Sequence, residues 1–278
     1  MKTLEGKVAI VTGGSRGIGK AITTQFLENG AKVMIVARSN NELMKTKMDF
    51  AKYGENAQVF PADVSSKNDV KALIRVTQQT FNTIDIVVNA AGVYGVIGAA
   101  SEVDFEKWKE AFNINLFGTF NMIQEIVPVF VKAGRRKIIN FSGGGDGPLP
   151  HFSAYSASKA AVVRLTETLA QEVKDNNIDV NAVAPGPVNT KFLEVALDAG
   201  ETLVGKELYA KLLKQKEEGG VAPEKAAALC VFLASSDSDG LSGKLVSAVW
   251  DKWSEWSKED IASFMEGNKL TLRRVNLE

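Results

Sequence analysis

Short apolar runs alternate along this chain with longer segments in which apolar residues recur every three or four positions. The first pattern is typical of strands buried on both faces of a parallel sheet, and the second of amphipathic helices. This alternation predicts an α/β fold. The predicted strands are residues 8–11, 32–37, 57–61, 84–88, 137–141, 178–184 and 244–249.

Helical periodicity fills most of the segments between these strands, at residues 18–27, 41–53, 70–81, 103–131 (in two parts), 154–173 and 223–234. Residues 191–220 are rich in Leu, Lys, Glu and Gly, which predicts a small helical lid over the strand ends. Residues 250–278 form an extra tail with three tryptophans, which we expect to dock on the domain or on a partner subunit. No repeat or linker divides residues 1–278, so a single domain is predicted.

Composition excludes several classes of function. Lys+Arg and Asp+Glu are both 33, so the net charge is zero, which argues against nucleic acid or an anionic membrane as a partner. One cysteine, Cys230, and one histidine, His151, exclude an internal disulfide and a Cys- or His-based metal cluster, so no metal is expected. The N-terminus is not typical of a signal peptide, and no run approaches the ~20 apolar residues that span a bilayer. A cytoplasmic location is expected.

The segment Thr12–Gly19 carries the strongest chemical signal, because a strand, a glycine turn and a helix start follow one another directly. Gly13 permits a tight turn, and Gly17 and Gly19 allow phosphates and a neighbouring strand to approach the backbone. The N–H groups of the helix N-terminus would face such an anion. The pattern predicts a dinucleotide site.

Residues after the second predicted strand indicate the kind of dinucleotide. An acidic residue there would bind a free ribose 2′-hydroxyl and favour NAD, but residues 37–40 contain none. Arg38, with Arg16 from the glycine turn, could instead hold a 2′-phosphate. The alternative is a pair of solvated surface arginines. We therefore expect NADP(H) rather than NAD(H).

Several polar residues stand at or near the ends of later strands. Asp63 could accept from an adenine amino group, or instead cap the next helix. Asn89 is expected to tie strands together, and the small residues after it would let a cofactor lie against the backbone. Asn115 lies among apolar residues, so its amide is either a structural hydrogen-bonding group or part of a site.

Tyr155 and Lys159 are four residues apart on a predicted helix, which places them on one helical face. Such a pair is often surface decoration, but the small residues around it would let the helix pack closely and leave room for a ligand. Ser142 ends the fifth predicted strand, at the sheet edge where ligands of α/β folds bind.

Together these motifs resemble the short-chain dehydrogenase/reductase family over about residues 4–249. They occur in the family's order: Thr12-Gly13-x-x-x-Gly17-x-Gly19, Asp63, Asn89-Ala90-Ala91-Gly92, Asn115, Ser142, Tyr155-x-x-x-Lys159 and Pro185-Gly186. The resemblance implies a Rossmann-type, doubly wound, seven-stranded parallel sheet with helices on both faces. It also implies hydride transfer to or from a nicotinamide cofactor.

The resemblance further assigns roles to residues. Tyr155 would be the acid/base, with its pKa lowered by Lys159, which would also hold the nicotinamide ribose. Ser142 would bind the substrate oxygen, and Asn115 would hold a water for proton relay. Cofactor contacts are expected at Gly13, Ser15, Arg16, Gly17, Ile18, Gly19, Arg38, Asp63, Val64, Asn89, Ala90, Gly92, Tyr155, Lys159, Pro185, Gly186, Val188 and Thr190.

Two departures from the family pattern bear on these roles. The family often has two serines after the fifth strand and uses the second, whereas this chain has Ser142-Gly143. Counting back from Tyr155 places the family's catalytic serine at Ser142, whereas counting forward from Asn140 places that position at Gly143. The seventh strand also lacks the Asp-Gly-Gly turn of many relatives and leads into the extra tail.

The sequence is best interpreted as an NADP(H)-dependent oxidoreductase acting on a small ketone or secondary alcohol, with 3-oxoacyl and sugar or polyol substrates both open. Residues 135–137, two arginines and a lysine, would either dock an acidic carrier protein or form a solvated charge cluster. The alternative function is an NADP-binding sensor or scaffold with little turnover. The resemblance implies a homodimer or homotetramer formed through helices near 103–131 and 154–174.

Overall fold

The computed structural model describes residues 2–143 and 147–273, and its centre is one seven-stranded parallel sheet in the order β3-β2-β1-β4-β5-β6-β7. The strand order reverses between β1 and β4, which leaves a crevice at the carboxyl ends of these strands. The strands are β1 Val8–Thr12, β2 Lys32–Ala37, β3 Ala57–Pro61, β4 Ile86–Asn89, β5 Arg136–Phe141, β6 Ile178–Ala184 and β7 Leu245–Ser247.

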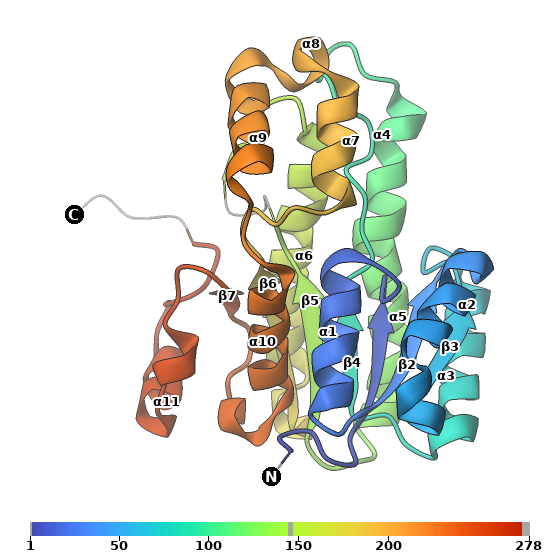
Figure 1. Ribbon diagram of the computed structural model, residues 1–278. Helices are drawn as coiled ribbons and strands as arrows, with labels where there is room; N and C mark the ends of the chain where they lie inside the picture. The colour runs from blue at the N-terminus through green and yellow to red at the C-terminus, as the bar shows by residue number, and fades with distance from the viewer. Residues whose placement is uncertain (1, 144–146, 274–278) are drawn as a thin grey trace.

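Helices cover both faces of this sheet (Figure 1). One core contains side chains of α1 (Gly17–Glu28), α2 (Asn40–Asp49) and α10 (Pro223–Ala234). The opposite core contains side chains of α3 (Lys67–Phe81), α5 (Gly118–Phe130) and α6 (Ser153–Glu172). The predicted doubly wound α/β architecture is therefore confirmed.

Two predicted strands are shorter than their apolar runs. β4 begins at Ile86 rather than at residue 84, and just before it the Asp85 carboxylate accepts from the Val8 N–H at 2.9 Å. β7 ends at Ser247 rather than at residue 249, because the Asp251 carboxylate accepts from the Ser247 N–H at 2.7 Å and turns the chain. At both places a carboxylate accepts a backbone N–H, while backbone hydrogen bonds continue beside it, from Asp85 to Val8 and from Ala248 to Ala184.

The segment predicted as two helices at 103–131 is one nearly continuous rod. A π-helical turn, Asn113–Phe117, joins α4 (Phe105–Phe112) to α5. Turns of this kind occur frequently at functional sites. This one places Asn115 inside the protein, where its side chain is fully buried.

The segment predicted as a lid, residues 191–220, contains α7 (Lys191–Ala199), α8 (Glu201–Val204) and α9 (Lys206–Glu218), which stand above the strand ends at the top of Figure 1. A third apolar cluster joins these helices to the loops after β4 and β5, with Ile97, Phe152, Ala196 and Val204 at its centre. The lid is therefore packed against the loops that surround the crevice.

The tail runs beside α10 and contains one 3₁₀ turn, η5 (Trp253–Glu255), and α11 (Lys258–Glu266). The Trp253 and Trp256 rings lie 5.8 and 6.2 Å from the Phe232 ring of α10, which agrees with the expected docking. Trp250 does not dock on the part of the chain that the structure describes: it is 80% exposed and lies in a turn outside any helix. Residues 274–278 of the predicted tail lie outside the described residues.

The basic residues at 135–137 pair with carboxylates of the chain, and only Arg135 of the three is exposed. The Lys137 ammonium is buried and lies 2.8 Å from carboxylate oxygens of both Asp179 and Asp239. Arg135 also pairs with Asp179 at 2.9 Å. The charges at 135–137 are therefore paired with carboxylates of the chain, which does not favour the expected docking of an acidic carrier protein there. Within residues 2–143 and 147–273, no helix is long and apolar enough to cross a membrane.

Candidate active site

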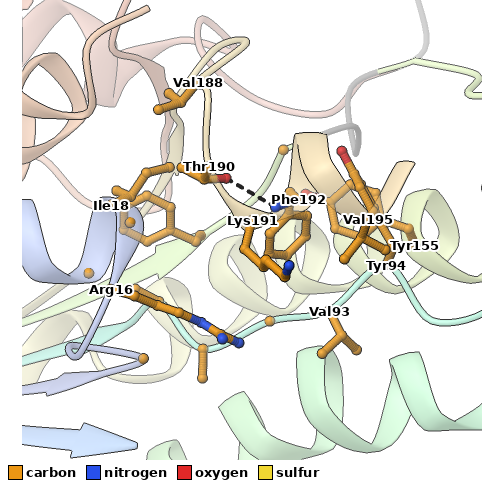
Figure 2. Close-up of a pocket in the computed structure, with 18 of the residues that line it drawn as sticks. Arg16, Ile18, Val93, Tyr94, Tyr155, Val188, Thr190, Lys191, Phe192 and Val195 are labelled. Atoms are coloured by element: carbon orange, nitrogen blue, oxygen red, sulfur yellow. Dashed lines mark hydrogen bonds between the residues drawn. The ribbon is translucent and has the colours of Figure 1, made fainter. Parts of the chain in front are cut away.

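A large pocket opens at the carboxyl ends of the strands, between the crevice and the lid (Figure 2). Its volume is about 1290 Å³, which exceeds the roughly 300–1,000 Å³ of ordinary small-molecule sites. Loops after all of the strands β1 to β6 line it, together with α4, α7 and α9. The pocket is therefore large enough for a dinucleotide and a second, smaller molecule.

The glycine turn forms one wall of this pocket and is closely packed from behind. A Cβ at Gly19 would lie 2.1 Å from the Gly13 carbonyl oxygen, and a Cβ at Gly13 would lie 3.0 Å from the Ala91 backbone. Arg16 is the N-cap of α1, and its side chain makes no capping hydrogen bond. The first-turn N–H groups of α1 are thus left for an anion, which is the arrangement that binds phosphates.

The predicted 2′-phosphate end of the pocket contains a carboxylate that the sequence analysis missed. Arg16 and Arg38 both line the pocket, as expected, but so does Glu42. The Arg16 guanidinium lies 3.5 Å from the Glu42 carboxylate, which also accepts from the Ser15 hydroxyl at 3.4 Å. Ser39 caps α2 and accepts from the Glu42 N–H, which brings the first turn of α2 to the glycine turn.

The polar residues after β3 and β4 differ in their access to the pocket. Asp63 lines it with Val64, and its carboxylate accepts from the Ser65 N–H at 2.9 Å. Ser66, not Asp63, caps α3. Asn89 does not line this pocket, since its buried amide donates to the Asn140 side chain at 2.9 Å and ties β4 to β5. Ala90 and Gly92 do line it.

Asn115 lies directly behind the pocket wall. Its carbonyl oxygen accepts from the Val93 N–H, and its amide donates to the Val93 carbonyl and to the Ser158 hydroxyl, each at 2.9 Å. A Cβ at Gly92 would lie 3.2 Å from the Asn115 carbonyl oxygen. Asn115 therefore holds the loop after β4 against α6, which fits the structural alternative for its buried amide.

Tyr155 and Lys159 lie on the pocket side of α6, as their spacing predicted. The Lys159 ammonium is 4% exposed, donates to the Phe141 carbonyl at 2.8 Å and lies 6.0 Å from the Tyr155 ring centroid. Burial lowers the pKa of Lys159 from 10.5 to about 8. Packing around both residues excludes water, so a charge on either side chain would be poorly solvated.

The protein's own residues do not lower the pKa of Tyr155, contrary to the expectation from the sequence. Burial raises the pKa of Tyr155 well above its usual value of 10, and the nearby Tyr94 phenol raises it further. Desolvation outweighs the Lys159 ammonium, which is engaged with a backbone carbonyl and is itself poorly solvated. Tyr155 is thus a neutral phenol, able to donate a proton.

The structure distinguishes Ser142 from Gly143. Ser142 lines the pocket and is 3% exposed, and its hydroxyl has no hydrogen-bond partner among the described residues. Gly143 has φ +88°, and a Cβ there would lie 2.8 Å from the Tyr155 hydroxyl oxygen. A side chain at 143 would thus collide with the Tyr155 hydroxyl, so glycine keeps that space open. Residues 144–146 of the predicted glycine loop lie outside the described residues.

The segment after β6 forms the opposite wall and leads into the lid. Pro185, Gly186, Val188 and Thr190 all line the pocket. The Thr190 hydroxyl caps α7 by accepting from the Phe192 N–H at 3.3 Å (Figure 2). A Cβ at Gly17 would lie 3.3 Å from the Thr190 methyl group, so this wall closely approaches the glycine turn.

An aromatic cluster surrounds Tyr155 and was not predicted. The Tyr94 ring lies edge-on to the rings of Phe152, Tyr155 and Phe192, at centroid distances of 4.9, 4.8 and 4.6 Å. Phe192 begins the lid, and Tyr94 follows β4. No sequence signal links these positions, because only the fold brings them together. Among the described residues, no group of three or more metal-ligating side chains was found.

Comparisons with known proteins agree with this geometry. The family model described as short chain dehydrogenase matches residues 7–199. The chain is 36% identical to a short-chain type dehydrogenase/reductase of Picea abies, covering 87% of this chain and 91% of that protein. It is 32% identical to the 3-oxoacyl-acyl-carrier-protein reductase FabG of Thermotoga maritima, covering 87% and 96%. A solved Pseudomonas aeruginosa RhlG/NADP active-site complex is similar with TM-score 0.77 and 29% identity, covering 88% and 95%.

Proposed function

Because this chain belongs to the short-chain dehydrogenase/reductase family, we propose that it transfers hydride between NADP(H) and a small ketone or secondary alcohol. The observation that carries the proposal is the placement of Tyr155 and Lys159 on one face of α6, inside the pocket at the strand ends. A neutral phenol held there is the group that protonation of a carbonyl oxygen requires.

The residues present fit a nicotinamide dinucleotide. The close-packed glycines and the N-terminus of α1 would hold its phosphates, and Asp63 and Val64 would flank the adenine. Lys159 would hold the ribose, while Val188 and Thr190 would hold the carboxamide. When bound, the nicotinamide would supply or accept the hydride.

The proton is handled by this chain's own residues. Tyr155 donates from its hydroxyl to the carbonyl oxygen in reduction and accepts the proton back in oxidation. The Ser142 hydroxyl, which lacks a partner among the described residues, is proposed as a second donor to the same oxygen. Asn115 fixes the neighbouring loop and is proposed to hold a water for proton return.

NADP(H) is proposed over NAD(H) because two guanidinium groups, Arg16 and Arg38, line the ribose end of the pocket. The name of the RhlG/NADP complex supports this preference. Glu42 weakens the preference for NADP(H), because its carboxylate would repel a 2′-phosphate. The same carboxylate pairs with Arg16. Two cations against one anion still leave a net positive site.

We further propose one dinucleotide-binding domain over residues 1–278, with residues 191–220 as a lid and 250–278 as a tail, in a cytoplasmic homodimer or homotetramer. Phe105, Phe117 and Phe120 on the α4–α5 rod are 65, 51 and 44% exposed, which supports assembly through this rod. Gel filtration with light scattering tests the assembly.

The test of function is NADPH oxidation across a panel of carbonyl compounds, with NADPH binding titrated in parallel. Turnover of at least one ketone that depends on Tyr155 supports the proposal. Tight NADPH binding without any turnover would favour the alternative of a sensor or scaffold.

A further inference from the structure

We propose that this site takes an apolar ketone or alcohol, in which a chain or ring without hydroxyl groups flanks the reacting carbon, and rejects sugars and polyols. The inference rests on the proposed oxidoreductase function and names its substrate class. The observation behind it is the aromatic and aliphatic wall that surrounds Tyr155 on the lid side of the pocket.

The aromatic part of this wall contacts the acid directly. Tyr94 packs edge-on against Tyr155, and the Phe192 ring lies 5.8 Å from the Tyr155 ring on another side. Tyr94, Tyr155 and Phe192 are each only partly buried, so the cluster leaves aromatic surface facing the cavity (Figure 2). A group attached to a carbonyl beside Tyr155 must therefore lie against aromatic rings.

The wall continues away from Tyr155 along the lid. Leu208 and Leu212 of α9 are four residues apart, so they share one helical face, and both line the pocket. Leu149, from the loop before α6, and Val195 of α7 line it as well. These side chains are only half-buried or exposed, so a bound molecule would gain by removing them from water.

Charged side chains also line the pocket, Lys107 and Glu110 on α4 and Lys216 on α9, but the side chains packed against the Tyr155 ring are the aromatic rings of Tyr94 and Phe192. Other polar groups on the lid side are already engaged. Lys191 and Glu194 form an exposed ion pair with each other at 2.9 Å, and Gln215 donates to the Asn189 side chain at 2.8 Å. Burial raises the pKa of Tyr94 to about 12, so its phenol stays neutral and adds no charge to this wall. A polyol would exchange water for apolar surface and leave several hydroxyls unpaired, each a substantial loss of affinity.

The first experiment compares two ketones of nearly the same shape. Pentan-3-one and 1,3-dihydroxyacetone differ by exchange of two methyl groups for hydroxyls. We expect kcat/KM with NADPH to be at least 100-fold higher for pentan-3-one, and to rise about threefold to fourfold per CH₂ from butan-2-one to octan-2-one. Equal or better use of dihydroxyacetone, or a flat series, would overturn the inference.

A binding arm separates this inference from the proposed function. The NADPH complex of Tyr155→Phe is titrated calorimetrically with the same ketones, so that turnover is not required. Kd should fall threefold to fourfold per CH₂ if the wall is the binding surface. If Kd falls in this way and wild type turns over no ketone, the proposed oxidoreductase function is wrong, but the apolar binding surface is supported. If Kd is independent of chain length, the substrate class is wrong whatever the turnover.

Phe192→Ala tests the wall itself, with Met48→Ala, which shortens an exposed apolar side chain of α2, as the control. Phe192→Ala should lower kcat/KM for octan-2-one roughly tenfold relative to butan-2-one, since only the longer chain extends across the ring. The control should leave this ratio unchanged. The same loss for both ketones with Phe192→Ala would mean that Phe192 only supports the fold around Tyr155.

Discussion

Replacing Lys159 by methionine should change how the stability of the protein depends on pH. Burial lowers the pKa of Lys159 from 10.5 to about 8, whereas the unfolded chain keeps the ordinary value. Between these two values the unfolded chain binds the additional proton, so the free energy of unfolding of wild type rises with pH. Methionine keeps most of the length of the side chain and removes the titration.

The magnitude follows from the two pKa values. A fall from 10.5 to about 8 corresponds to about 3 kcal/mol of stability that is missing below pH 8 and regained by pH 10.5. About 2 kcal/mol of it lies between pH 7 and pH 9.5. The lost hydrogen bond to the Phe141 carbonyl shifts the variant's stability at every pH and leaves this difference intact.

The assay is urea unfolding of both proteins without cofactor, at several values between pH 7 and 9.5. Wild type should gain about 2 kcal/mol relative to Lys159→Met over this range. A difference in stability that does not depend on pH would mean that the ammonium is better solvated than its burial indicates. The account of why Tyr155 stays neutral would then be wrong as well.

Four further changes have defined outcomes. Glu42→Gln should tighten NADPH binding about threefold to tenfold with little effect on NADH, because it removes a charge that repels the 2′-phosphate. Arg38→Ala should weaken NADPH binding more than NADH binding. Both are measured by fluorescence titration, and tighter wild-type binding of NADH than of NADPH would contradict both expectations. Ser142→Ala should lower kcat by roughly one to three decades, and near-wild-type turnover would assign the second donor role to another group. Truncation after Asp251 should lower the melting temperature or dissociate the oligomer, because it removes Trp253 and Trp256 from α10; an unchanged melt and mass would show that the tail is expendable.

The parts of this fold that could be predicted from the sequence are those with short-range signals. Continuous apolar runs located all seven strands, and the glycine turn located the phosphate end of the pocket, because both depend on neighbouring residues. The spacing of Tyr155 and Lys159 placed them on one helical face for the same reason.

The rest depends on contacts between distant segments. Glu42 lies two residues beyond segment 37–40 and reaches the ribose end because Ser39 caps α2 beside the glycine turn. Tyr94 and Phe192 are far apart in sequence and meet only through the lid. Lys137 looked solvated within its basic run, yet the fold pairs it with carboxylates from β6 and the turn before β7.

The most direct test of the central claim is turnover by wild type and Tyr155→Phe, each with NADPH affinity measured in the same preparation. The best ketone from the chain-length series serves as substrate. The account predicts that Tyr155→Phe binds NADPH as wild type does and loses nearly all turnover, because the substitution removes only the hydroxyl that donates the proton. Equal turnover by the two proteins would show that Tyr155 is not the acid and would contradict the account.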